Sequence, residues 1–255
     1  MPSTLFDLSG QVALVTGSTK GIGKSIAEEL ARAGAKVVVS SRKADACEAV
    51  RAEFEREGLT AIAKPCNVSR KDEVEALVAH TLSAWGKIDI LVCNAAVNPY
   101  YGPLAKLPDE TFAKVMTANL QSSIWLSALV APGMAERGGG CIILVGSIGG
   151  ILGTGTLGIY GMSKAADHAL ARNLAVEWGP KNVRVNAIAP GLIKTDFARA
   201  LWEDEKLRSS REAVTPLRRI GAPEEIGGIA VFLASKAGSF VTGQTIVADG
   251  GVTIV

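Results

Sequence analysis

Short apolar runs alternate along the chain with longer stretches of helical periodicity. Several of the runs are apolar almost throughout, which is typical of strands covered on both faces. Between the first two runs, Ile22–Ala33 places Ile22, Ile26 and Leu30 on one helical face, and Gly34 ends the pattern. This β-α-β order predicts an α/β fold with a doubly wound parallel sheet. Strands are expected at Val12–Thr16, Lys36–Ser40, Ala61–Cys66, Ile88–Cys93, Gly140–Ser147, Val183–Ala189 and Thr245–Ala248.

Three longer segments complete the pattern. Pro108–Ala131 is long enough for one whole helix after its Pro-Asp-Glu start, and Tyr160–Trp178 predicts another that stops at Gly179-Pro180. Leu192–Pro216 is charged and irregular, so we interpret it as a loop. Loops of that length in compact domains are usually functional or mobile, and we expect this one to close over a ligand. Its large apolar residues, which would form a pocket wall, are Phe197, Leu201 and Trp202.

Composition favours a single globular domain. Of 255 residues, 48% are hydrophobic and 20% charged, so we treat residues 1–255 as one domain with its own core. Lys+Arg of 27 against Asp+Glu of 25 is too balanced for a protein that binds nucleic acid through clustered cations. Met1–Gly10 lacks the features of a secretory signal. The apolar run Cys141–Leu152 is far shorter than the ~20 residues that cross a bilayer, so we expect a soluble protein without membrane contact.

The cysteines do not suggest a metal site or a disulfide framework. They are widely scattered, without CxxC spacing or neighbouring histidines, so we expect buried or idle thiols in a reducing cytosol and no metal. The four are Cys47, Cys66, Cys93 and Cys141.

A glycine-rich turn joins the first expected strand to the first expected helix. Glycines there permit a tight turn, and the helix N-terminus offers free N–H groups to a diphosphate. An ordinary βα turn is the alternative, but this position in a β-α-β unit favours a dinucleotide. The expected contacts are Gly17, Ser18, Thr19, Lys20, Gly21, Ile22 and Gly23.

The end of the second strand favours NADP(H) over NAD(H). Enzymes that use NAD commonly place an Asp or Glu here for the ribose 2′-OH, and none follows Val39-Ser40. Ser41 and Arg42 come instead, and Lys20 can approach from the glycine turn, giving partners for a 2′-phosphate. The alternative is that Arg42 and Lys20 are only solvated surface residues.

Tyr160 and Lys164 are candidates for acid–base chemistry. They lie four residues apart on one face of an expected helix. An ammonium near a phenol favours the phenolate, which lowers a pKa that starts near ~10. Ser147, thirteen positions before Tyr160, ends an apolar strand. Its hydroxyl could hold a substrate oxygen against the phenol. Asn119 lies inside the preceding helix, where an amide is mildly unfavourable; kinking or satisfying the helix backbone is its structural alternative.

These motifs together resemble the short-chain dehydrogenase/reductase family. The turn has the family's Thr-Gly-x-x-x-Gly-x-Gly spacing, and the four polar residues match its Asn-Ser-Tyr-Lys tetrad. The resemblance covers nearly the whole chain and implies a Rossmann-type fold, with the cofactor part at residues 10–150 and a substrate loop at 192–216. Further matching segments are Asp89–Ala96, Val185–Thr195 and Phe240–Gly251.

The resemblance also implies roles for individual residues. Tyr160 would be the acid/base, Lys164 would lower its pKa and bind the nicotinamide ribose, Ser147 would position the carbonyl, and Asn119 would hold a water of the proton relay. The departures are Cys93 and Ala96, which replace Asn and Gly, and Gly146, which replaces a frequent Ser. The other implied cofactor contacts are Asn67 and Val68 along the adenine, Asn94 and Ala95 on the ribose side, Ile193 and Thr195 at the carboxamide, and also Ala96, Pro190 and Gly191. For each of these softer contacts, and for Asn67 in particular, packing at a strand end is the alternative.

Within the family, the chain looks most like the NADP-dependent carbonyl and retinal reductases. That similarity implies an apolar or aromatic ketone or aldehyde as substrate, and a homotetramer that packs the outer faces of the helices containing Asn119 and Tyr160. Some animal relatives end in a peroxisomal Ser-Lys-Leu-like tripeptide, whereas this chain ends Thr253-Ile254-Val255, so we expect a cytoplasmic protein. Alternatives on the same scaffold are a 3-oxoacyl-carrier-protein reductase, a sugar or polyol dehydrogenase, and a non-catalytic redox-sensing nucleotide-binding module.

Overall fold

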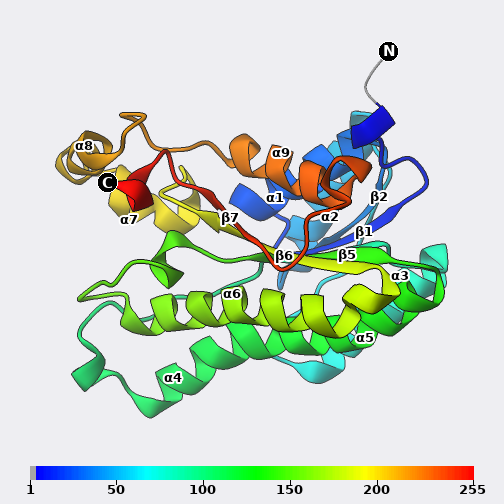
Figure 1. Cartoon of the computed structure of the whole chain (residues 1–255), viewed down its shortest axis with the longest axis horizontal. Helices are drawn as coiled ribbons and strands as arrows, with labels where there is room; N and C mark the ends of the chain where they lie inside the picture. The colour runs from blue at the N-terminus through cyan, green and yellow to red at the C-terminus, as the bar shows by residue number, and fades with distance from the viewer. Residues whose placement is uncertain (1–3) are drawn as a thin grey trace.

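A seven-stranded parallel sheet organises the structure, a computed structural model that describes residues 4–255 (Figure 1). The first three residues of the expected domain, which also begin the segment Met1–Gly10, lie outside the described residues. Every strand pair is parallel, in the order β3-β2-β1-β4-β5-β6-β7, so the predicted doubly wound, Rossmann-type fold class is confirmed. The strands are β1 Val12–Thr16, β2 Lys36–Ser40, β3 Ala61–Ala63, β4 Ile90–Cys93, β5 Gly140–Val145, β6 Val183–Pro190 and β7 Thr245–Ala248.

Helices cover both faces of the sheet (Figure 1). Successive strand residues point to opposite faces, so Ala13 and Val15 pack in one core while Leu14 packs in the other. The predicted alternation of helix and strand therefore buries both faces. One face carries α1 Gly21–Arg32, α2 Ala44–Arg56 and α9 Pro223–Ala234, and the other carries α3 Lys71–Trp85, α5 Ser122–Glu136 and α6 Gly158–Trp178.

Three strands are shorter than the sequence predicts: β3, β5, and β4, which begins at Ile90 and not at Ile88. After β3, Pro65 offers no N–H, although the amides of Lys64 and Cys66 still donate to the carbonyls of Val39 in β2 and of Ser41 just after it, at 3.0 and 2.9 Å. Asn67 therefore follows an irregular extension rather than the end of a regular strand. In β5, the strand ends at Val145, and Ser147 instead caps a 3-10 turn by accepting the Gly149 amide at 3.0 Å.

The helix expected at 108–131 is interrupted and longer. It consists of α4 Asp109–Met116, a π-helical turn Thr117–Gln121 that contains Asn119, and α5, which runs to Glu136. Pro132 lies inside α5 instead of ending it. A proline removes one intrahelical hydrogen bond, and Met134 just beyond it is buried in the core, so packing keeps the last turn helical.

The segment 192–216 is largely helical, so its prediction as an irregular loop was wrong. It contains a 3-10 turn Asp196–Ala198, then α7 Arg199–Trp202 and α8 Glu205–Val214. Asp204 caps α8, since its Oδ1 accepts the Leu207 amide at 2.9 Å. Within residues 4–255, no helix is long and apolar enough to cross a membrane.

Candidate active site

A cavity of about 1680 Å³ opens at the carboxyl ends of the central strands. This is the edge at which ligands bind in open parallel sheets. Of the residues predicted for the site, only Ser18 and Asn119 do not line the cavity. Those that do are Gly17, Thr19, Lys20, Gly21, Ile22, Gly23, Ser41, Arg42, Asn67, Val68, Asn94, Ala95, Ala96, Ser147, Tyr160, Lys164, Pro190, Gly191, Ile193 and Thr195.

The glycine turn is built by close contact with Asn94. A Cβ atom added at Gly23 would lie 2.3 Å from Asn94 Nδ2, and one added at Gly17 would lie 2.8 Å from it. Gly17 also has a φ of 67°, which disfavours a side chain. Asn94 Nδ2 donates to the carbonyls of Thr16 and Gly17 at 2.9 and 3.1 Å. The backbone of the turn and the N-terminus of α1 are therefore left facing the cavity, as a diphosphate requires.

Two residues of the turn differ from their predicted roles. Ser18 is fully buried, and its hydroxyl donates to the Val15 carbonyl at 2.8 Å and accepts the Ser40 amide at 2.8 Å. It therefore joins the ends of β1 and β2 instead of facing a cofactor. Lys20 lines the cavity, but its Nζ lies 3.7 Å from Asp196 and so already has an anionic partner in the protein. Its contact with a 2′-phosphate stays a prediction.

The end of β2 presents the groups expected for a 2′-phosphate site. Arg42 is exposed at the cavity wall and forms no ion pair among the described residues. Ser41 lines the same wall, and its amide donates to Cys47 Sγ at 3.1 Å. No carboxylate lines the cavity at this end of β2.

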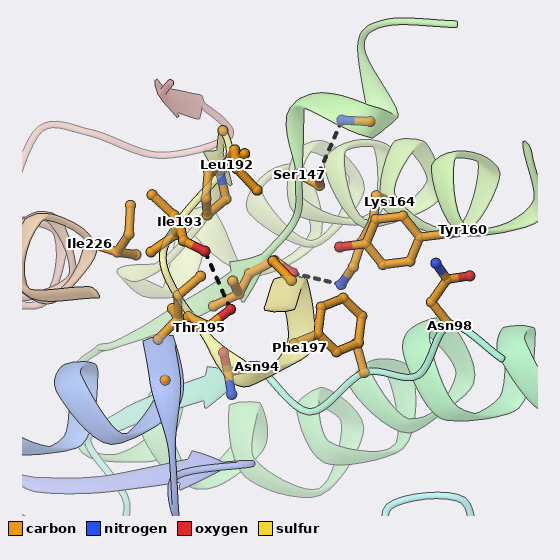
Figure 2. Close-up of a pocket in the computed structure, with 18 of the residues that line it drawn as sticks. Asn94, Asn98, Ser147, Tyr160, Lys164, Leu192, Ile193, Thr195, Phe197 and Ile226 are labelled. Carbon is orange, nitrogen blue, oxygen red and sulfur yellow. Dashed lines mark hydrogen bonds between the residues drawn. The ribbon is translucent and has the colours of Figure 1, made fainter. Parts of the chain in front are cut away.

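Tyr160, Ser147 and Lys164 meet at one side of the cavity (Figure 2). Ser147 and Tyr160 flank Gly149, because a Cβ placed there would lie 3.4 Å from Ser147 Oγ and 3.7 Å from the Tyr160 ring. Lys164 Nζ lies 5.9 Å from the centre of that ring and donates to the Val145 carbonyl at 2.7 Å. The first two turns of α6 thus set a phenol and an ammonium beside a hydroxyl.

Buried groups around Lys164 control its charge. Burial alone would lower the pKa of Lys164, but the Asp167 carboxylate, 3.0 Å away, raises it above the usual value. Burial raises the pKa of the Cys93 thiol to about 12 and lowers the pKa of His168 to about 4. Both are therefore neutral near pH 7, and Lys164 remains the cation of this cluster.

Asn119 acts on the backbone rather than on the cavity. Its Oδ1 accepts the Val97 amide at 2.8 Å, and its Nδ2 donates to the Val97 carbonyl at 3.0 Å and to Ser163 Oγ at 3.0 Å. The side chain therefore clamps the segment after β4 to α6. These bonds support the structural alternative for the side chain, and the water-holding role that the resemblance implies stays a prediction.

Gly146 is explained by a bulky neighbour. A Cβ at this position would lie 2.4 Å from His168 Nε2. The imidazole therefore occupies the space into which a serine side chain would point. The packing of His168 thus accounts for the glycine at this position. His168 Nε2 is itself buried without a hydrogen-bond partner among the described residues.

The outer part of the cavity is mainly apolar. The Phe197 and Tyr160 ring centres are 6.0 Å apart, and Leu201 lines the same wall. Trp202 does not, because its indole N–H donates to the Thr195 carbonyl at 2.8 Å, so that part of the predicted wall was wrong. Asn98, which the sequence reasoning missed, also lines the cavity and is labelled in Figure 2.

Asp167 was also missed, although the sequence carries a signal for it. It lies three residues after Lys164, on the face of α6 that also buries Ala171 and Leu174. A carboxylate on a buried helix face is seldom left unpaired. That pattern alone would have indicated a partner for Lys164.

Comparisons with known proteins agree with this geometry. Residues 17–253 match the family model described as Enoyl-(Acyl carrier protein) reductase. Dehydrogenase/reductase SDR family member 4 of Bos taurus is 45% identical over 244 residues, which cover 96% of this chain and 88% of the bovine protein. A solved 7α-hydroxysteroid dehydrogenase, complexed with NADH and 7-oxo glycochenodeoxycholic acid, shares 39% identity at a TM-score of 0.94, covering 98% of this chain and 97% of its own.

A gluconate 5-dehydrogenase from Burkholderia cenocepacia, complexed with NADP and tartrate, also superposes at a TM-score of 0.94. It shares 34% identity and covers 99% of this chain and 98% of its own. The fold, the spacing of the motifs and these similarities lead to one conclusion. The chain belongs to the short-chain dehydrogenase/reductase family, whose members are oxidoreductases acting on alcohol and carbonyl groups.

Proposed function

We propose that this protein reduces an apolar or aromatic ketone or aldehyde with hydride from NADP(H). The observation that carries the proposal is that the glycine turn, Tyr160 and Ser147 all face one cavity whose outer wall is apolar. A carbonyl compound seated against that wall would therefore lie between the cofactor and a proton donor.

Each polar group of the site has a distinct role in the proposal. Bound NADPH would supply the hydride and leave as NADP⁺. Tyr160 gives its proton to the carbonyl oxygen, and Ser147, whose Oγ already accepts the Gly149 amide, has its own O–H free to hold that oxygen. Lys164 favours the phenolate that remains and binds the nicotinamide ribose. Asn119 positions this machinery through Val97 and Ser163.

The cofactor would extend across the carboxyl edge of the sheet. The diphosphate would bind the glycine turn at the N-terminus of α1, with the 2′-phosphate at Ser41 and Arg42. The adenine would lie along Asn67 and Val68. The carboxamide would reach the end of β6 and the residues that follow it, namely Pro190, Gly191, Ile193 and Thr195.

A second substrate class is favoured by two cations. Lys114 and Arg211 also line the cavity and could pair with a carboxylate. The gluconate 5-dehydrogenase of similar structure acts, by its name, on a sugar acid. A ketone bearing a carboxylate is therefore the alternative to a wholly apolar one.

A substrate panel tests the proposal. NADPH oxidation would be measured with an aromatic ketone, an α-dicarbonyl, retinal, a 3-oxoacyl thioester and a keto-sugar acid. The expected result is highest kcat/KM for the first three, and higher kcat/KM for the keto acid would select the alternative. Tyr160→Phe is the control, expected to lower kcat at least about a hundredfold while the cofactor Kd stays within about twofold. Retained turnover in that variant would remove Tyr160 from its role.

Assembly and location complete the proposal. A homotetramer is supported by apolar side chains exposed on α4, α5 and α6, including Phe112, Ile124 and Val176. Val176 is among the most exposed of these side chains, with 80% of its surface accessible. A reducing compartment such as the cytoplasm is supported by the four cysteines, all of which are free and buried.

A further inference from the structure

Lys164 has three N–H groups, and protein acceptors take two of them. One bonds the Val145 carbonyl at 2.7 Å and another the Asp167 carboxylate at 3.0 Å. Val145 ends β5 and Asp167 lies one helical turn along α6, so both acceptors are fixed by regular structure. Among residues 4–255 no third acceptor bonds this nitrogen, and Lys164 lines the cavity. The third N–H is therefore left for the site.

Asp167 belongs to this arrangement without reaching the cavity. Its side chain is 3% exposed and that of Lys164 is 4% exposed, so the ion pair is buried. Asp167 does not line the cavity, and its Oδ1 has no hydrogen-bond partner among the described atoms. A buried carboxylate that bonds one ammonium and little else can influence the reaction only through that ammonium.

The neighbouring titratable groups do not replace Asp167 as the charge partner of Lys164. Cys93 on β4 and His168 on α6 face the same cluster, and both are neutral near pH 7 for the reasons given above. Tyr160 lies on the cavity side of Lys164, and Arg172 lies near His168 and lowers its pKa further. Within the described chain, Asp167 is the one carboxylate paired with Lys164.

We propose that Asp167 is a positioning residue that holds Lys164 as an ammonium, with its remaining N–H left for the cofactor ribose and its charge near the Tyr160 ring. The inference rests on the role proposed above for Lys164. Without the carboxylate, burial disfavours the charged lysine, and the protonated form is lost at lower pH. Cofactor affinity should then become sensitive to pH in a range where the wild type is not.

Asp167→Asn tests this by cofactor binding instead of turnover. The Kd of NADPH, or of NADH if the wild type prefers it, is measured by nicotinamide fluorescence from about pH 7 to about pH 10, near the ordinary lysine pKa. The wild-type Kd should change less than about threefold. The variant should match it near pH 7 and then weaken by up to about tenfold per pH unit as Lys164 loses its proton. Its kcat should fall over the same pH range.

Asp89→Asn is the matched control. Asp89 also pairs with a lysine, Lys87 at 2.8 Å. It comes directly before β4, however, at the amino ends of the strands and away from the cavity. Its removal should leave the pH dependence of the cofactor Kd unchanged. A parallel pH profile in wild type and Asp167→Asn would overturn the proposal, because a purely structural role would change stability and not the titration.

A second measurement covers the case in which Asp167→Asn does not fold. The Nζ resonance of Lys164, assigned with Lys164→Arg, is followed by NMR in the wild type. It should remain that of an ammonium above about pH 10, and a titration at or below the ordinary lysine pKa would overturn the proposal. A failure of the proposed function appears separately, as a wild type that binds cofactor but turns over no carbonyl of the panel.

Discussion

Gly146→Ala should destabilise the protein, because the space beside Gly146 is filled by His168. The new Cβ would lie 2.4 Å from His168 Nε2 and 3.1 Å from the Ile188 carbonyl oxygen. The first distance is about 1 Å shorter than an ordinary contact. The Gly146 amide also donates to the Ile188 carbonyl at 2.7 Å, so the backbone cannot move away freely. Overpacking of this kind costs about 1–3 kcal/mol.

The assay is equilibrium unfolding in urea with a parallel thermal scan. For a protein of this size the expected loss corresponds to a fall in Tm of roughly 2–10 °C. Turnover should fall as well, because Ser147 follows directly and would be displaced. Gly228→Ala is the control: it is also a glycine, it lies in α9, and an added Cβ meets nothing within 4 Å, so it should be neutral or stabilising by up to about 1 kcal/mol.

The cause can be isolated by a double-mutant cycle. In a His168→Ala background the imidazole is gone, so Gly146→Ala should lose most of its cost, giving a coupling of about 1–3 kcal/mol. The reasoning is refuted if Gly146→Ala is as stable and active as the wild type. It is also refuted if the cost is the same with and without His168.

Three further predictions follow from the site and the surface. Arg42→Ala should lower kcat/KM for NADPH by about tenfold to a hundredfold and for NADH by less than about twofold, with part of the effect screened by salt; a wild type that uses NADH equally well or better would contradict the cofactor assignment. Segment 192–216 should become resistant to limited proteolysis when NADPH and a substrate analogue are bound, and unchanged cleavage would show that it does not close. Sedimentation at micromolar concentration should give the mass of a tetramer, and Val176→Asp should shift it toward smaller species, whereas a monomeric wild type would rule out the assembly.

The sequence was most informative where one local pattern decides one structural outcome. The apolar face of Ile22–Ala33 and the strand Val12–Thr16 are read directly from periodicity, and both lie within one residue of the observed bounds. The spacing of Tyr160 and Lys164 likewise needs only the geometry of one helix. These features depend on residues that are close together in the chain.

The errors come from contacts between distant parts of the chain. The inward turn of Ser18 depends on the end of β2, and the clamp made by Asn119 depends on Val97 and α6. The π-helical turn and the continuation of α5 past Pro132 are packing outcomes that no local propensity indicates. The helices of 192–216 were missed because their polarity resembles that of a loop, although Asp204 provided a capping residue.

Two walls of the cavity should tolerate mutation differently, because the clamp at Asn119 holds only one of them. Residues 94–98 are tied to the glycine turn through Asn94 and to α6 through Val97 and Asn119, and Ser163 carries the connection to the Tyr160 carbonyl at 2.7 Å. A change in that wall would disturb cofactor and acid together. The wall formed by 192–216 carries fewer such ties to the tetrad, so directed evolution of new substrate preferences should gain most from libraries placed there.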